Sequence, residues 1–164
     1  MTSRVLKPEP LTAAAFAPYG DVISCAAAKE QRSINYGNTV RFHDLARLDL
    51  TVGEGQPTVS IFRSSPVPRP IDIKIMERHP LSSQAFYPLS GRPYMVVVAP
   101  RGSFDPARLK AFLAGTDQGV NYHAGTWHHY SLALEDVSDF LVIDRDGPGD
   151  NCDEIAVENT RIDY

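Results

Sequence analysis

Short runs of alternating apolar and polar residues, separated by prolines and glycines, most strongly constrain the fold of this 164-residue chain. Such alternation is typical of half-buried β-strands, because successive side chains in a strand point to opposite faces. Thirteen prolines and eleven glycines divide the chain into segments that are too short for long helices. The sequence therefore predicts a mainly β protein. The runs that alternate in this way are 58–63, 71–79, 84–89, 94–99, 128–134 and 139–144.

Helical signals occur in only two segments, 11–20 and 105–115. Thr12 is a candidate N-cap for the first helix. Asp105 is a candidate N-cap for the second, with Pro106 at the first helical position. Many short strands with two or so short peripheral helices favour an antiparallel β-sandwich or barrel.

The composition is that of an ordinary globular domain, with 43% hydrophobic and 22% charged residues. No linker or repeat interrupts the chain, so we expect residues 1–164 to form one domain. The net charge of −4 argues against nucleic-acid binding, and no apolar run approaches the ~20 residues that span a bilayer. The first residues lack the apolar core of a signal peptide, and Cys25 and Cys152 predict free thiols. We therefore expect a cytoplasmic protein that binds neither nucleic acid nor membrane.

Strand alternation in segment 71–79 places two ionisable side chains on an apolar face. Three isoleucines occupy every second position, and the same face continues to Glu77 and His79. Buried ionisable groups are costly unless they are paired or used. We predict that Glu77 and His79 line a functional interior. The alternative is that the barrel mouth begins at Met76 and that Glu77 is solvated.

The adjacent histidines at positions 128 and 129 would point to opposite faces of a strand. His128 shares its face with Tyr130 and two leucines, which is typical of an interior face. His129 shares the other face with Trp127. We predict that His128 faces the interior and that His129 is structural, although a sheet contact or a dimer interface would also suit His129.

Arg63 follows Val59 and Ile61 on one face of segment 58–63, which predicts a guanidinium at the inner end of an apolar face. The planar guanidinium matches a carboxylate, so Arg63 is a candidate carboxylate clamp. An internal salt bridge, for example to Glu77 or Asp144, is the alternative.

Motifs for phosphate binding, for a nucleophilic serine and for the HExxH type of zinc site are absent from the sequence. Histidines, carboxylates, amides and arginines remain. These groups suit acid–base chemistry, or a metal held by nitrogen and oxygen ligands.

Two segments resemble the metal-binding motifs of the cupins. In ERHPLSSQAFYPLSG the ligand positions fall on Glu77, His79 and Gln84, and in HAGTWH they end at His128, with His123 in place of a proline. The resemblance implies a cupin-type antiparallel β-barrel or jelly roll. An amide is a poor ligand for transition metals, so Gln84 weakens the case for tightly bound iron or manganese. Glu77, His79 and His128 remain as candidate ligands of an optional divalent metal.

A closer resemblance covers nearly the whole chain. The segments PYGDVI, RFHDLA, ERHPLSSQAFYPLSG, GVNYHAGTWHH, DFLVIDR and DNCD, in this order, are similar to those of the ureidoglycolate lyases of allantoin degradation. The resemblance implies a homodimer that cleaves (S)-ureidoglycolate to glyoxylate and urea. Nickel is associated with some members of that family.

Cleavage of this substrate requires a base for the hydroxyl proton, an acid for the departing nitrogen and a cation for the carboxylate, but no organic cofactor. On this interpretation Glu77, His79 and His128 line the reacting centre, and one of them is the base. His123 is a candidate acid, or else only a turn residue. Gln84 would hydrogen-bond the ureido group or orient a histidine.

Arg63 is the first candidate and Arg41 the second for binding the substrate carboxylate. The alternative for Arg41 is a surface arginine beside Asp44. Tyr122 would form a wall of the substrate pocket or serve in packing.

Other functions also fit these residues. One is a metal-dependent cupin isomerase or dioxygenase, which needs three or four good ligands. Another is a non-catalytic module that binds a small acid such as glyoxylate. A hydrolytic variant of the same step would release ammonia and carbon dioxide in place of urea.

Overall fold

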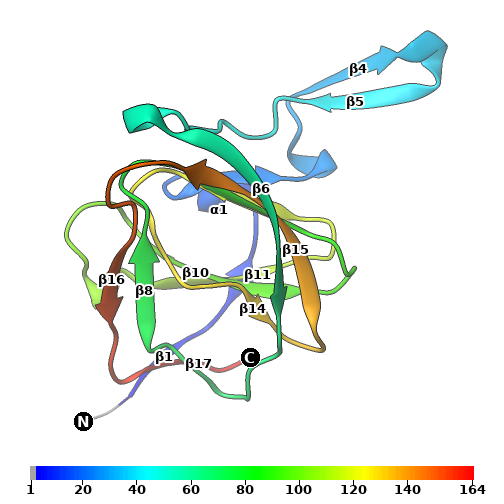
Figure 1. Cartoon of the computed structure of the whole chain (residues 1–164). Helices are drawn as coiled ribbons and strands as arrows, with labels where there is room; N and C mark the ends of the chain where they lie inside the picture. The colour runs from blue at the N-terminus through cyan, green and yellow to red at the C-terminus, as the bar shows by residue number, and fades with distance from the viewer. Residues whose placement is uncertain (1–2) are drawn as a thin grey trace.

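A computed structural model describes residues 3–164, and Figure 1 shows a β-barrel from which one hairpin projects. The chain is mainly β, as the alternation predicts. Besides one α-helix there are 3-10 helices at Cys25–Ala27, Asn35–Gly37, Val52–Glu54 and Pro106–Arg108. The other elements are β1 (Arg4–Leu6), β2 (Glu9–Pro10), α1 (Ala13–Phe16), β3 (Gly20–Ile23), β4 (Glu30–Ile34), β5 (Thr39–His43), β6 (Gln56–Ser64), β7 (Ile71–Asp72), β8 (Ile75–Arg78), β9 (Gln84–Pro88), β10 (Tyr94–Ala99), β11 (Lys110–Ala114), β12 (Gly119–Tyr122), β13 (Trp127–His128), β14 (Leu132–Ala133), β15 (Ser138–Asp146), β16 (Asp153–Ala156) and β17 (Thr160–Ile162).

Two mostly antiparallel sheets form the barrel. One has the order β3-β12-β9-β15-β6. The other has the order β16-β8-β13-β10-β11-β2, with β14 also paired to β10. A smaller sheet, β1-β17-β7, forms no strand pairs with these two in the described part of the chain. This architecture agrees with the cupin-type barrel expected from the sequence. Within residues 3–164, no helix combines the length and hydrophobicity needed to cross a bilayer.

Strand β10 is buried on both faces. Alternate residues from Tyr94 to Val98 pack in the barrel interior against the side chains of Phe16 and Phe112. The residues between them, such as Val97, pack in a second cluster with residues of the β1-β17-β7 sheet. A strand covered on both faces needs apolar residues throughout, which explains the uninterrupted sequence YMVVVA.

The two predicted helices have different outcomes. Helix α1 is confirmed, and the Thr12 side chain accepts a hydrogen bond from the backbone N–H of Ala15. The helix predicted for 105–115 is wrong, because the chain there forms one 3-10 turn and then strand β11. Strand β11 pairs along β10 and buries Phe112, so the local helical signal yields to tertiary pairing.

A two-stranded hairpin, β4–β5, stands away from the barrel (Figure 1). Its strands pair only with each other, and every residue of β4 is exposed. The tip carries positive φ angles at Asn35, Tyr36 and Gly37. This hairpin was not predicted, because its residues lack an alternating apolar face that packs on the barrel.

Candidate active site

Strands β8 and β13 bring three of the predicted residues together. Glu77 and His128 are register partners, and Glu77 Oε1 lies 3.8 Å from His128 Nδ1. His79 follows β8, and its ring centre lies 5.1 Å from that of His128. These residues form one cluster, while their roles stay predictions.

The face that carries Glu77 differs from the one expected. Ile71 and Ile73 pack in the second core cluster together with Met76, on the side of the sheet away from Glu77. Residues 73–74 lie between β7 and β8, so the alternation changes phase there. The predicted continuous face from Ile71 to His79 is therefore wrong. The Glu77 side chain is nevertheless only 27% exposed, unlike a fully solvated rim residue.

His128 is 1% exposed, and its ring stacks on that of Tyr122 with 4.2 Å between centroids. Burial, with a smaller contribution from His79, lowers the pKa of His128 to about 3. The ring is therefore neutral near pH 7. Its Nδ1 donates to the carbonyl oxygen of His129 at 3.3 Å. Its Nε2 is buried without a hydrogen-bond partner among the described residues and so keeps a free lone pair.

A chain of hydrogen bonds holds the ring of His79. The Nδ1 atom lies 2.7 Å from the carbonyl oxygen of Asn151, and Nε2 lies 3.1 Å from Gln84 Oε1. The amide nitrogen of Gln84 donates to Asp144 at 3.1 Å. A carboxylate only accepts, so the amide oxygen of Gln84 must face His79. Both ring nitrogens of His79 therefore face hydrogen-bond acceptors.

The Glu77 carboxylate is partly shielded from water and lies near another acidic side chain, Glu154. Burial is the main cause that raises the pKa of Glu77. Glu154 adds to this effect and His79 opposes it. The Cys152 thiol lies 4.0 Å from Glu77 Oε2, and burial raises the pKa of that thiol. A carboxylate with a raised pKa is a better proton acceptor near neutral pH than an exposed one.

The cluster also fits a divalent metal. Ligand atoms of Glu77, His79 and His128 all lie within 4.8 Å of one another. Two imidazole nitrogens and a carboxylate oxygen suit divalent transition metals. The Nε2 atom of His128 has no hydrogen-bond partner among the described residues, so its lone pair is free to bind a metal. These three residues could therefore hold the metal that the cupin resemblance implies.

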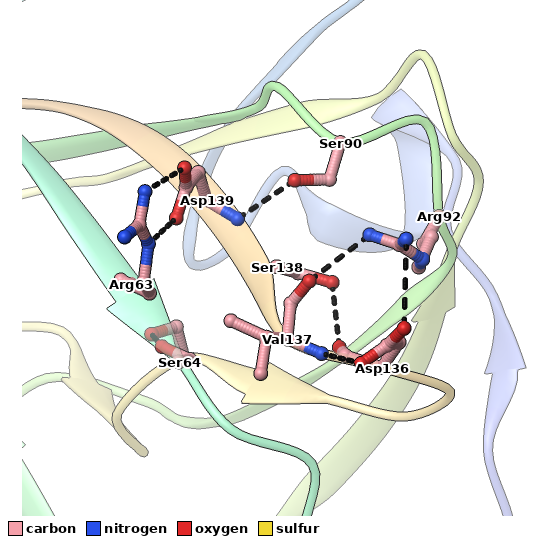
Figure 2. A network of polar contacts seen from close by, with 9 residues as sticks. Arg63, Ser64, Ser90, Arg92, Asp136, Val137, Ser138 and Asp139 are labelled. Atoms are coloured by element: carbon pink, nitrogen blue, oxygen red, sulfur yellow. Dashed lines mark hydrogen bonds and ion pairs between the residues drawn. The ribbon is translucent and has the colours of Figure 1, made fainter.

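Arg63 does not reach this cluster, and its predicted facing is wrong. Its side chain is 73% exposed and donates to Asp139 at 2.8 and 3.0 Å, as Figure 2 shows. Val59 and Ile61, on the same face, are 68% and 60% exposed. Alternation identified residues that share a face but not its direction. The opposite face of β6 points inward, where Phe62 packs on Phe86. An internal salt bridge to Glu77 or Asp144 is likewise wrong.

His123 also lies outside the cluster. It follows Tyr122 directly in the chain, and Tyr122 points into the barrel against His128. The His123 ring points to the other side and lies 3.1 Å from the Asp21 carboxylate. The predicted role of His123 as the acid of this cluster therefore has no support in its position.

Arg41 lies on β5 of the projecting hairpin, away from the barrel interior. No ion pair joins it to Asp44 within the described part of the chain. His129 is buried beside His128 because β13 ends at His128 and strict alternation stops there. It donates from Nδ1 to the carbonyl of Tyr130 at 3.0 Å.

Asp144, Asn151 and Cys152 are contacts of the site that the sequence analysis did not assign to it. For Asp144 the signal was present, since it shares a face with Phe140 and Val142, which are buried. The loop positions of Asn151 and Cys152 carry no alternation, so only the folded chain places them.

The buried His128 predicts a loss of stability in acid. Its pKa is about 3 in the folded chain, against an ordinary value of 6.5. Below pH 6.5 the unfolded chain therefore binds a proton that the folded chain excludes. Stability should fall by about 1.4 kcal/mol per pH unit through this group, and above pH 6.5 the group has no effect. Urea unfolding of the wild type and His128→Gln at pH 7.5 and 5 should show a smaller pH dependence in the variant. Equal dependence would contradict the assignment.

The fold and this cluster together define a cupin-type β-barrel that holds two histidines and a glutamate side by side. A family model described as ureidoglycolate lyase matches residues 3–163, and the chain belongs to this family.

Proteins named ureidoglycolate lyase from several bacteria are similar to this chain. One from Burkholderia mallei (strain NCTC 10229) is 53% identical over 151 residues, covering 92% of this chain and 88% of that protein. One from Brucella anthropi is 54% identical over 152 residues, covering 93% and 89%. One from Burkholderia cepacia is 53% identical over 155 residues, covering 94% and 87%.

Proposed function

We propose that this chain is a ureidoglycolate lyase, which cleaves (S)-ureidoglycolate to glyoxylate and urea in the degradation of allantoin. The observation that carries the proposal is the family match over residues 3–163, with relatives of that name at 53% identity over most of the chain. The Glu77–His79–His128 cluster supports it, because it offers a proton acceptor and a proton donor side by side.

In the proposed reaction, one carbon of the substrate bears a hydroxyl, a carboxylate and a ureido nitrogen. Glu77 accepts the hydroxyl proton as the C–O bond becomes a carbonyl and the C–N bond breaks. His79 donates a proton from Nε2 to the departing nitrogen, which leaves as urea. The proton that Glu77 gained and the one that His79 lost balance, so no redox cofactor or covalent intermediate is needed.

Gln84 positions the proton donor in this scheme. Its amide is bonded to His79 on one side and to Asp144 on the other, so the ring of His79 is held in one orientation. Neutral His128 presents an unpartnered Nε2, which can accept a hydrogen bond from the substrate. If Glu77, His79 and His128 instead held a divalent metal, its Lewis acidity would lower the pKa of the substrate hydroxyl, and these ligands would not transfer the protons themselves.

We also propose a homodimer in the cytoplasm. Both cysteines, Cys25 and Cys152, are free, which suits a reducing compartment. Strand β6 exposes Val59 and Ile61 on a broad sheet face, and an apolar face of this kind is typical of an interface between subunits.

The identity of the products tests the proposed function. Purified protein given (S)-ureidoglycolate should release urea and glyoxylate in equal amounts, and no ammonia. Coupled assays for urea, ammonia and glyoxylate on one reaction measure all three. Ammonia in place of urea would indicate the hydrolytic reaction. Binding of glyoxylate without turnover of ureidoglycolate would indicate a module that only binds small acids.

A further inference from the structure

Among the described residues, no lysine or arginine is bonded to the acid–base cluster, which consists of Glu77, His79, His128 and their neighbours Gln84 and Asp144. Glu77 and Asp144 both belong to it, and a carboxylate oxygen of Glu154 lies within 4.8 Å of one of Glu77. Across residues 3–164, no hydrogen bond or ion pair joins a lysine or arginine to Glu77, His79, Gln84, His128 or Asp144. A substrate with a carboxylate would meet net negative charge there. If the proposed function is correct, a basic side chain that binds the substrate carboxylate has to come from outside these residues.

The projecting β4–β5 hairpin carries such a cation. Arg32 and Arg41 are directly opposite each other in the hairpin register, an arrangement in which like charges repel. Arg32 is paired with Glu30 at 2.6 Å. The Arg41 guanidinium has no hydrogen bond or ion pair within the described chain. Arg41 is therefore an exposed and uncompensated charge that a bound anion would neutralise.

The hairpin itself lacks support within one chain. A lone two-stranded hairpin is at best marginally stable in water. This one pairs with no other strand of the described chain, and Tyr36 and Val40 on it are exposed. Figure 1 shows it directed away from the barrel of its own chain. Contacts with another molecule would supply the missing stabilisation.

Strand β6 offers a matching surface. It is an edge strand of nine residues that pairs only with β15, so one side of its backbone is open. Long open edges with exposed apolar residues such as Val59 and Ile61 favour pairing with another chain. Thr58 of β6 is the register partner of Asp144, so this edge lies beside the acid–base cluster.

We propose that the β4–β5 hairpin of each subunit lies along the open edge of β6 in a second copy of the chain and places Arg41 at that copy's acid–base cluster, where it binds the substrate carboxylate. If the hairpin extends the sheet in this way, the residues on each of its two faces have a place in the partner's barrel. Val40 and Phe42 continue the apolar outer face of β6. Arg41, on the opposite face, is directed toward the interior. Two-fold symmetry makes both sites composite.

Arg41→Ala tests the role of this side chain, which the proposal makes a substrate-binding residue. Loss of a charge-assisted bond to the carboxylate should lower kcat/KM for ureidoglycolate by roughly 10²-fold, mainly through KM. Arg41→Lys should recover part of the loss. Arg108→Ala, at another exposed arginine, should behave as wild type. Wild-type kinetics in Arg41→Ala would overturn the proposal.

Mixing two variants, each nearly inactive at substrate concentrations well below KM, tests whether the sites are shared. His128→Ala removes a cluster residue, and Arg41→Ala removes the contribution from the hairpin. In a mixed dimer, one site combines an intact cluster with an intact hairpin and the other carries both defects. Refolding the two variants together in equal amounts should restore about a quarter of wild-type activity, because half of randomly paired dimers contain one intact site. A mixture that folds and stays inactive would overturn the proposal.

Sedimentation velocity tests the contact without any substrate, so a failure of the proposed function is distinguishable from a failure of this inference. The wild type should be a dimer. A chain in which residues 31–42 are replaced by a short Gly-Ser turn should be a folded monomer, since the strands of the hairpin pair with no other strand. A monomeric wild type, or a dimer that survives removal of the hairpin, would overturn the proposal.

Discussion

Replacement of Glu77 by Gln is expected to lower kcat for urea release by roughly 10²–10⁴-fold, the usual contribution of general acid–base catalysis. The amide keeps the shape of the side chain but cannot accept the hydroxyl proton. Burial is the main cause that raises the pKa of Glu77, and this makes the carboxylate effective near neutral pH. Steady-state kinetics on purified protein, with thermal unfolding to verify the fold, measure the effect.

Glu135→Gln provides the matched control, because Glu135 is an exposed carboxylate after β14 with no hydrogen bond or ion pair within residues 3–164. Its kinetics should equal those of the wild type. A Glu77→Gln variant that keeps wild-type kcat would remove Glu77 as the base and leave His128 or His79 in that role.

Replacement of Gly20 by Ala should have the largest effect on stability. A Cβ at this position would lie 1.8 Å from the carbonyl oxygen of Asn121 and 3.2 Å from Cα of Tyr122. Both atoms belong to the backbone of β12, so they can move only if the pairing of β3 with β12 is broken. We expect the free energy of unfolding to fall by more than ~3 kcal/mol.

Urea unfolding of Gly20→Ala beside Gly115→Ala measures this cost against a control. A Cβ on Gly115 would meet only flexible side-chain atoms, the nearest at 3.4 Å, so that variant should unfold close to the wild type. Because Tyr122 stacks on His128, displacement of β12 should also reduce activity in Gly20→Ala. Stability within ~0.5 kcal/mol of wild type would show that β3 and β12 separate easily.

The barrel could be predicted from the sequence because apolar and polar side chains alternate along its strands, and this pattern is visible in short segments. Strand β10 matches its predicted range, 94–99, and β6 and β15 extend their predicted ranges by a few residues. The segment 105–115 could not be predicted in this way. Its capping signals are those of a helix, and only pairing with β10 makes it a strand.

The candidate site was predictable where two independent signals agreed. Alternation and motif spacing both selected His128, and the structure places it beside Glu77 and His79. Alternation alone could not give the direction of the face that carries Arg63, since an apolar outer face has the same pattern as an inner one. The position of Arg41 depends on a hairpin without local apolar patterning, so no periodic signal could place it.

The double burial of β10 affects how this site can change in evolution. His128 is the register partner of Val98 on β10, so a central group of the cluster is attached to a strand with no exposed face. Substitutions on that strand disturb packing on one side or the other, whereas β6 and the hairpin can be substituted at little cost in folding free energy. Changes in substrate preference among relatives should therefore concentrate in the hairpin and along β6, while His128, on the strand paired with β10, stays constant.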